Sequence, residues 1–107
     1  MMRLYNATKK RVICDDCSKV NAVIGLMFQV PHPVIFSVKT PRIIALHNMF
    51  VFGTTDVIFL ANDKVVEIKK NFYPFTFFTP KKKSTHVVEL PTGMAKGISV
   101  NDQLLLR

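Results

Sequence analysis

The chain has 107 residues, of which 49% are hydrophobic and 21% are charged. This composition supplies a hydrophobic core and excludes an intrinsically disordered chain. The length fits one domain over residues 1–107 and is smaller than that of typical Rossmann or barrel enzymes.

The chain is strongly basic, with fifteen Lys and Arg against seven Asp and Glu and a formal charge of +8. Such a charge favours polyanionic partners, which include nucleic acid, phosphorylated ligands and anionic lipid surfaces. Residues 1–6 carry no apolar signal-peptide core, and no stretch approaches the ~20 apolar residues of a membrane helix. We therefore expect a cytoplasmic protein without membrane contact.

The first predicted elements are a hairpin and a helix. The hairpin has its strands at residues 3–6 and 10–14. The helix is predicted from Ser18 to Ile24, because Ser18 is a good N-cap and Gly25 stands where a left-handed residue can end a helix. The spacing of Val20, Val23 and Ile24 gives this segment one apolar stripe.

The remainder is predicted as short strands, because the chain has six prolines and interior prolines break helices. Residues 57–61 are apolar on both faces, which predicts a central buried strand, with residues 65–70 as its hairpin partner. Residues 72–78 are aromatic but contain Pro74, so they form an edge strand or an ordered loop. Further strands are predicted at residues 34–38, 43–52, 85–90, 98–100 and 103–106.

Together these elements predict a mainly β fold. Many short strands with little helix are typical of a compact sandwich or barrel. Such folds expose edge strands, so the protein is expected to be a monomer or a homodimer.

Cys14 and Cys17 form a Cys-x-x-Cys motif between a predicted strand and a predicted helix. A helix N-terminus lowers a thiol pKa and would favour redox chemistry, whereas the two aspartates between the cysteines oppose thiolate formation. Three interpretations remain open: thiol redox, a local disulfide and a reduced structural pair. No second cysteine pair completes a four-cysteine zinc site, so no metal or cofactor is predicted.

Polar residues interrupt the apolar strands at His47, Asp56 and Glu89. A buried polar group without a partner costs ~1–3 kcal/mol, so such groups either pair with each other or serve a ligand. One interpretation is structural pairing, with Asp56 capping a turn. The other is a pocket on a concave face, where His47, Asp56 and Glu89 bind a small polar ligand or an ion.

Lys81, Lys82 and Lys83 follow the aromatic run at residues 72–78. Exposed aromatic rings stack on bases while lysines hold phosphates, so this region is a candidate nucleic-acid or polyanion surface. The structural alternative is that the aromatics fill the core and the lysines are solvated turn residues.

Several segments in order resemble the archaeal-type branch of the family called domain of unknown function 192. They are Gly25-Leu26-Met27-Phe28, residues 44–52, Asp56-Val57-Ile58-Phe59-Leu60, residues 87–93 and residues 97–102. The resemblance implies a compact β-rich fold of jelly-roll type with a short helix near the Gly-Leu-Met motif. It implies no enzymatic activity.

The sequence therefore predicts a small non-catalytic β-domain that binds a small ligand or a protein partner on a concave face. No Gly-x-Ser-x-Gly elbow and no Gly-rich phosphate loop is present, which disfavours the corresponding enzyme classes. Nucleic-acid binding through Lys81–Lys83 is the alternative, and thiol redox at Cys14 and Cys17 is a third.

Overall fold

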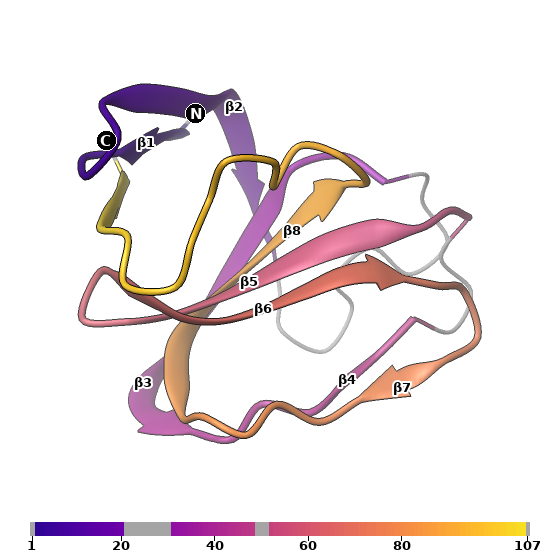
Figure 1. Ribbon diagram of the computed structural model, residues 1–107. Helices are drawn as coiled ribbons and strands as arrows, with labels where there is room; N and C mark the ends of the chain where they lie inside the picture. Colours follow the sequence, from indigo (N-terminus) through magenta and orange to yellow (C-terminus); the bar gives the residue numbers. More distant parts are fainter. Residues whose placement is uncertain (1, 21–30, 49–51, 107) are drawn as a thin grey trace.

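The computed structural model describes residues 2–20, 31–48 and 52–106. This described part of the chain contains nine strands and no helix (Figure 1). The strands are β1 (Met2–Asn6), β2 (Arg11–Lys19), β3 (Val34–Arg42), β4 (Leu46–His47), β5 (Thr55–Ala61), β6 (Lys64–Phe72), β7 (Phe77–Phe78), β8 (Ser84–Pro91) and β9 (Leu104–Leu106). The predicted mainly β fold is confirmed.

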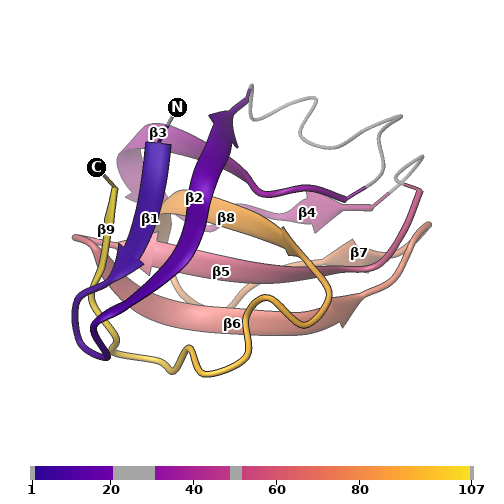
Figure 2. The same cartoon turned by 90° about the horizontal axis from the view of Figure 1, so that it is seen from above.

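Seven strands form one sheet in the order β6-β5-β8-β3-β2-β1-β9, and β4 pairs with β7 in a second, two-stranded sheet. The large sheet curls, so that its two edges approach each other (Figure 2). Lys64 and Gln103 form an isolated antiparallel β-bridge through their backbones, and the Leu104 amide donates a hydrogen bond to the Asp63 carbonyl at 2.8 Å. Closing the edges in this way removes unpaired strand groups that would otherwise be exposed. The architecture is a sandwich with barrel-like curvature.

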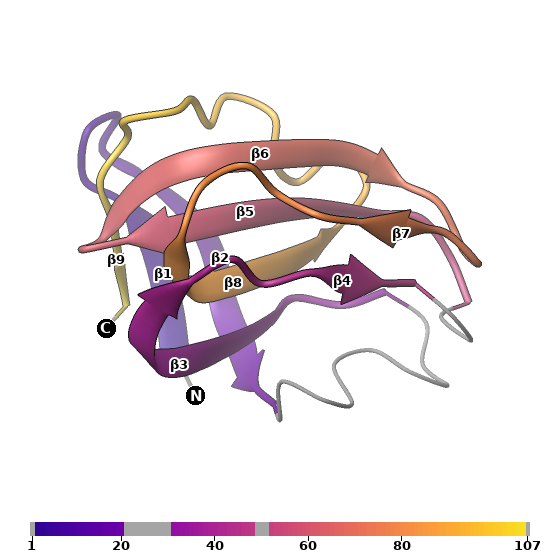
Figure 3. The same ribbon diagram turned by 90° about the horizontal axis from the view of Figure 1, so that it is seen from below.

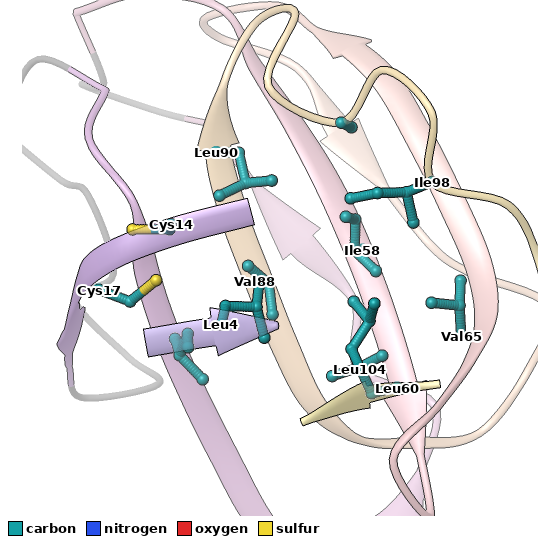
Figure 4. Packing of buried hydrophobic residues seen from close by; sticks show 12 residues of the cluster. Leu4, Cys14, Cys17, Ile58, Leu60, Val65, Val88, Leu90, Ile98 and Leu104 are labelled. Carbon is teal, nitrogen blue, oxygen red and sulfur yellow. The ribbon is translucent and has the colours of Figure 1, made fainter. Parts of the chain in front are cut away.

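Two hydrophobic cores lie on opposite faces of the large sheet. The first core is enclosed by the curl, and Figure 4 shows how its side chains converge. The second core fills the space between the outer face and the β4–β7 sheet, which lies in front of β5 and β8 in Figure 3. The first includes Leu4, Ile35, Ile58, Leu60, Val65, Val88, Leu90 and Leu104, and the second includes Phe36, Leu46, Val57, Phe59, Phe72 and Val87.

Strand β5 serves both cores. Its neighbours are β6 and β8, and residues 55–60 are all buried. Ile58 faces the first core, whereas Val57 and Phe59 face the second. A strand covered on both sides needs apolar residues at consecutive positions, so the predicted central buried strand is confirmed.

The predicted helix beginning at Ser18 is wrong at its start. Ser18 and Lys19 belong to β2, where Ser18 pairs in parallel with Val34. The Ser18 amide donates to Pro33 O at 3.1 Å and the Val20 amide donates to Ile35 O at 3.0 Å. These bonds satisfy the backbone in an extended form, so no N-cap forms. The rest of the predicted helix, residues 21–24, and the Gly-Leu-Met motif lie outside the described residues.

Two predicted strands are also shorter or absent. Of residues 43–52, only Leu46–His47 form a strand, and residues 49–51 lie outside the described part. Residues 98–100 form turns instead of a strand, because the Ile98 amide donates to Ala95 O and the Asp102 amide donates to Ser99 O, both at 3.0 Å. The segment from β8 to β9 is therefore a folded connection that covers the first core.

Candidate functional site

The structure does not bring His47, Asp56 and Glu89 into one pocket. Asp56 pairs with Leu90 of the first core, whereas Glu89 pairs with Val57 of the second core. Directly paired residues in an antiparallel ladder project to the same face. Asp56 and Glu89 thus face opposite sides of the sheet, and His47 is exposed on β4.

Asp56 is buried and connects the end of strand β6 to the turn that follows β8. Its Oδ1 accepts a hydrogen bond from the Asn71 amide at 3.0 Å, and its Oδ2 accepts one from the Gly93 amide at 2.9 Å. Asn71, near the end of β6, has a φ of 56° and Gly93, in the turn after β8, has a φ of 96°, so both donors have positive φ. This carboxylate joins the end of β6 to the start of the β8–β9 connection.

Glu89 is the buried titratable group without a compensating partner among the described residues. Its side chain is 6% exposed, and burial raises its pKa to about 7. The Thr55 hydroxyl is buried and also lacks a hydrogen bond. Because Thr55 pairs with Pro91, it lies on the same face as Glu89, one diagonal position away. The second core therefore contains two buried polar side chains, Thr55 and Glu89, near the start of β5.

One concave feature of the described residues is a groove between the start of β2 and the β8–β9 connection. Its volume is about 560 Å³. In Figure 1, β1 and β2 lie on one side and the β8–β9 connection, drawn in orange and yellow, lies on the other. The lining residues are Asn6, Arg11, Val12, Ile13, Gly93, Met94, Lys96, Gly97 and Ile98. We call this feature the β2 groove.

Two of the residues that line the β2 groove, Arg11 and Lys96, are cationic. The other lining residues are neutral, and none is a carboxylate. Neither cation forms an ion pair with a described residue. The aliphatic side chains of Val12, Ile13 and Ile98 complete the lining. The groove therefore combines positive charge with apolar surface.

Arg11 lies over Gly97. A Cβ at position 97 would stand 2.8 Å from Arg11 Nη1, and Gly97 has a φ of 86°. Only glycine adopts this backbone readily and leaves room for the guanidinium. Gly97 thereby allows the Arg11 side chain to lie against the β8–β9 connection.

A second buried carboxylate fixes the far end of the same wall. Asp102 Oδ2 accepts hydrogen bonds from Asn6 Nδ2 and from the Ser99 amide, both at 2.9 Å. Lys9 Nζ lies 3.0 Å from the same oxygen and donates to Gly97 O at 2.6 Å. Asp56 and Asp102 together hold residues 93–99 at both ends, so the groove wall has a defined position.

The groove was missed by the sequence analysis because its walls are distant in the chain. The sequence contains one indication of a structured connection, which is the pair of glycines Gly93 and Gly97 between two predicted strands. Both have positive φ in the structure. Nothing in the sequence places them against Arg11.

Cys14 and Cys17 are free, buried and part of the first core (Figure 4). They lie on strand β2, not at a helix N-terminus. Burial, the hydrogen bond that the Cys17 thiol donates to Cys14 and the electrostatic effect of Cys14 and Asp16 raise the pKa of Cys17 above its ordinary value. A raised pKa disfavours the thiolate that redox catalysis requires.

The aromatic run divides between the core and the surface. Phe72 is buried and Phe78 half-buried, whereas Tyr73, Phe75 and Phe77 are exposed. The side chains of Lys81, Lys82 and Lys83 are exposed beside the turn that follows. No group of three or more His, Cys, Asp or Glu suited to a metal occurs among the described residues. Within that part of the chain, we find no helix with the length and apolarity to cross a membrane.

The fold resembles two solved bacterial structures. One, from Sinorhizobium meliloti and described as a "putative transcription regulator", has a TM-score of 0.79 and 23% identity, over 97% of this chain and 90% of that one. The other, from Novosphingobium aromaticivorans and of unknown function, has a TM-score of 0.77 and 21% identity, over 97% of this chain and 82% of that one. At this identity the likeness concerns the fold alone.

Archaeal relatives share more of the sequence. The UPF0127 protein PF1050 of Pyrococcus furiosus is 32% identical over 84 residues, which cover 76% of this chain and 72% of that protein. The UPF0127 protein PYRAB11210 of Pyrococcus abyssi is 31% identical with the same coverage. The family model DUF192, described as "Uncharacterized ACR", matches residues 18–106. The predicted resemblance is thus confirmed, and the chain belongs to the DUF192 family.

Proposed function

We propose that this protein binds a small organic anion, with an apolar body and a phosphate or carboxylate head, in the β2 groove. The observation that carries the proposal is the presence of both Arg11 and Lys96 in the lining of a groove that has no carboxylate among its lining residues. A guanidinium binds phosphate and carboxylate oxygens in pairs, which gives both affinity and orientation.

The size of the groove supports a small ligand. Pockets for small molecules commonly measure roughly 300–1,000 Å³, and the β2 groove measures about 560 Å³. Its aliphatic lining would bury the body of the ligand, while Lys96 and Arg11 hold the head. A free inorganic anion would use the cations only and gain nothing from the aliphatic side chains.

The proposal is tested by calorimetric titration with three probes: phenyl phosphate, inorganic phosphate and benzyl alcohol. Phenyl phosphate is expected to bind most tightly, because it alone offers both a doubly charged head and an apolar ring. The Arg11→Gln variant is expected to lose about 10–100-fold in affinity for phenyl phosphate, which corresponds to a charged hydrogen-bond pair of ~1.5–3 kcal/mol.

Arg3→Gln is the matched control, since it removes the same charge from an exposed side chain paired with Asp15 at 3.4 Å. It is expected to leave phenyl phosphate affinity unchanged. Equal affinity in Arg11→Gln and the parent, or equal affinity for benzyl alcohol and phenyl phosphate, would contradict the proposal. An absence of any phenyl phosphate binding by the parent would contradict it as well.

A further inference from the structure

A second surface, separate from the β2 groove, displays aromatic side chains on the outside of the β4–β7 sheet. On β7, Phe78 turns inward and packs against Phe59 and Phe72, with ring centroids 5.9 and 6.5 Å apart. Strand alternation turns the neighbouring Phe77 outward, where it is 76% exposed. The His47 ring stands beside Phe77, with centroids 6.5 Å apart. Figure 3 shows this small sheet as the outer layer of the molecule.

The loop before β7 adds two more aromatic residues. Tyr73 is 59% exposed and Phe75 is 61% exposed. Their backbone is held by Asn48, which is buried: its Nδ2 donates to Phe72 O, and its amide donates to Thr76 O, both at 2.8 Å. The rings are therefore presented on an ordered backbone without being drawn into the core.

Three exposed lysines, Lys81, Lys82 and Lys83, follow these aromatic residues in the chain. Glu67 Oε1 accepts the amides of Lys81 and Lys82 at 2.8 and 3.0 Å, which fixes the lysine turn against β6. The lysine side chains remain exposed. In an extended chain the four residues from Phe77 to Lys81 span about 13 Å.

We propose that this outer face of the β4–β7 sheet, with Phe77 as its central ring and Lys81 and Lys82 at its border, binds single-stranded nucleic acid. Exposed rings stack on unpaired bases, and a bordering row of cations holds the phosphates. The choice of partner follows from charge complementarity, since the chain carries +8 overall and the exposed lysine turn follows β7 directly in the chain. A duplex stacks its bases internally and cannot use the rings, so single strands are the matching class.

The test is fluorescence anisotropy of a labelled oligothymidine of about 15 nucleotides, a length within the usual site sizes for such surfaces. The parent is expected to bind this strand more tightly than a duplex of equal length. Phe77→Ala is expected to weaken binding by about 5- to 150-fold, since one stacked base contributes ~1–3 kcal/mol. Phe77 is mostly exposed, so this variant is expected to fold normally.

The charge component is tested by the salt dependence. The double variant Lys81→Gln, Lys82→Gln is expected to reduce the slope of log affinity against log salt by about 1.4, which is two phosphate contacts at ~0.7 each. Val12→Ala removes another exposed apolar side chain and is the control for Phe77→Ala. Arg11→Gln is the control for the lysines, and both controls are expected to retain parental oligonucleotide affinity.

Three results would overturn the inference. They are parental affinity in Phe77→Ala, duplex binding as tight as single-strand binding, and no binding at about 50 mM salt, where electrostatic contacts are strong. A dimer of the parent that Phe77→Ala dissociates, without oligonucleotide binding, would assign this face to a second copy of the chain instead. Because the β2 groove is tested with Arg11→Gln, either site can fail without the other.

Discussion

Lys9 and Asp102 form an ion pair in which Lys9 Nζ lies 3.0 Å from Asp102 Oδ2, with the carboxylate side chain only 6% exposed. The pair joins the turn of the first hairpin to the end of the β8–β9 connection. Asn6 and Ser99 donate to the same carboxylate oxygen. One carboxylate thus holds three segments together beside the β2 groove.

Replacing Asp102 by Asn is expected to lower the free energy of unfolding by about 1–3 kcal/mol, because the Lys9 charge and two donors lose an ionised acceptor. Urea denaturation measures this change. Asp15→Asn is the matched control: it breaks the Arg3–Asp15 pair, whose side chains are 57% and 79% exposed, and such pairs contribute at most ~1 kcal/mol. Equal free energies of unfolding in Asp102→Asn and Asp15→Asn would contradict the stabilising role of Asp102.

The same carboxylate predicts acid sensitivity. Burial alone would raise the pKa of Asp102, but hydrogen bonds from Ser99, Asn6 and Lys9, together with the Lys9 charge, lower it below its usual value. A lowered folded-state pKa stabilises the protein above the unfolded pKa, and this contribution is lost as the pH falls through the folded value. Parental stability below about pH 4 should therefore fall more steeply than that of Asp102→Asn, as measured by urea denaturation at several pH values.

Glu89 predicts the opposite pH dependence at higher pH. Burial raises its pKa from 4.5 to about 7, so between these values the folded state holds a proton that the unfolded state has released. Stability then decreases as the pH rises through this window and is constant above it, with a total loss on the order of 3 kcal/mol. Glu89→Gln is expected to remove this slope and to be more stable than the parent at pH 8.

Unfolding free energies measured between pH 5 and pH 8 test the Glu89 prediction. Glu67→Gln is the control, because the Glu67 carboxylate accepts backbone amides of Lys81 and Lys82 near the surface. It should keep the parental slope. A slope that persists in Glu89→Gln would show that another group titrates.

Gly97 and Gly93 offer a matched pair for the β2 groove. Both have positive φ, but an added Cβ meets Arg11 at 2.8 Å only at position 97, and nothing within 4 Å at position 93. Alanine at either position should cost about 1 kcal/mol of stability or somewhat more through backbone strain. Only Gly97→Ala should displace Arg11 and weaken phenyl phosphate binding, as measured by calorimetry. Equal losses of phenyl phosphate affinity in both variants would contradict a role of Arg11 in binding this ligand.

Asp56 is expected to act on the same wall from its other end. Asp56→Ala leaves the amides of Asn71 and Gly93 without their acceptors and should cost about 1–3 kcal/mol. Hydrogen exchange provides a local readout: both amides should exchange faster at a pH where the variant remains folded. An unchanged exchange rate of the Gly93 amide would show that the turn at Gly93 is stable without Asp56.

Much of the fold follows from local patterns in the sequence. The apolar run at residues 57–61 predicts a strand buried on both faces, and the first hairpin and the β5–β6 hairpin follow from turn residues. Ser18 misled the prediction because its N-cap preference is local, whereas its pairing with Val34 is a long-range contact. Tertiary pairing overrides such propensities.

The site was harder to predict, because it depends on register. Asp56 and Glu89 lie on adjacent strands, and a shift of one residue would bring both to the same face. Only the observed pairing of Asp56 with Leu90 separates them. Likewise, the β2 groove forms where residues 11–13 meet residues 93–98, and no periodicity within either segment reports that meeting.

The position at which an organic anion binds tests the proposed function most directly. The decisive measurement is a titration of isotope-labelled protein with phenyl phosphate, followed through the amide resonances. The largest shifts are expected at Arg11, Val12 and Ile13 and across residues 93–98, and they should be lost in Arg11→Gln. Shifts concentrated instead at a shallow depression whose lining includes Lys39 and Arg42, or spread evenly over the surface lysines, would contradict the proposed binding site.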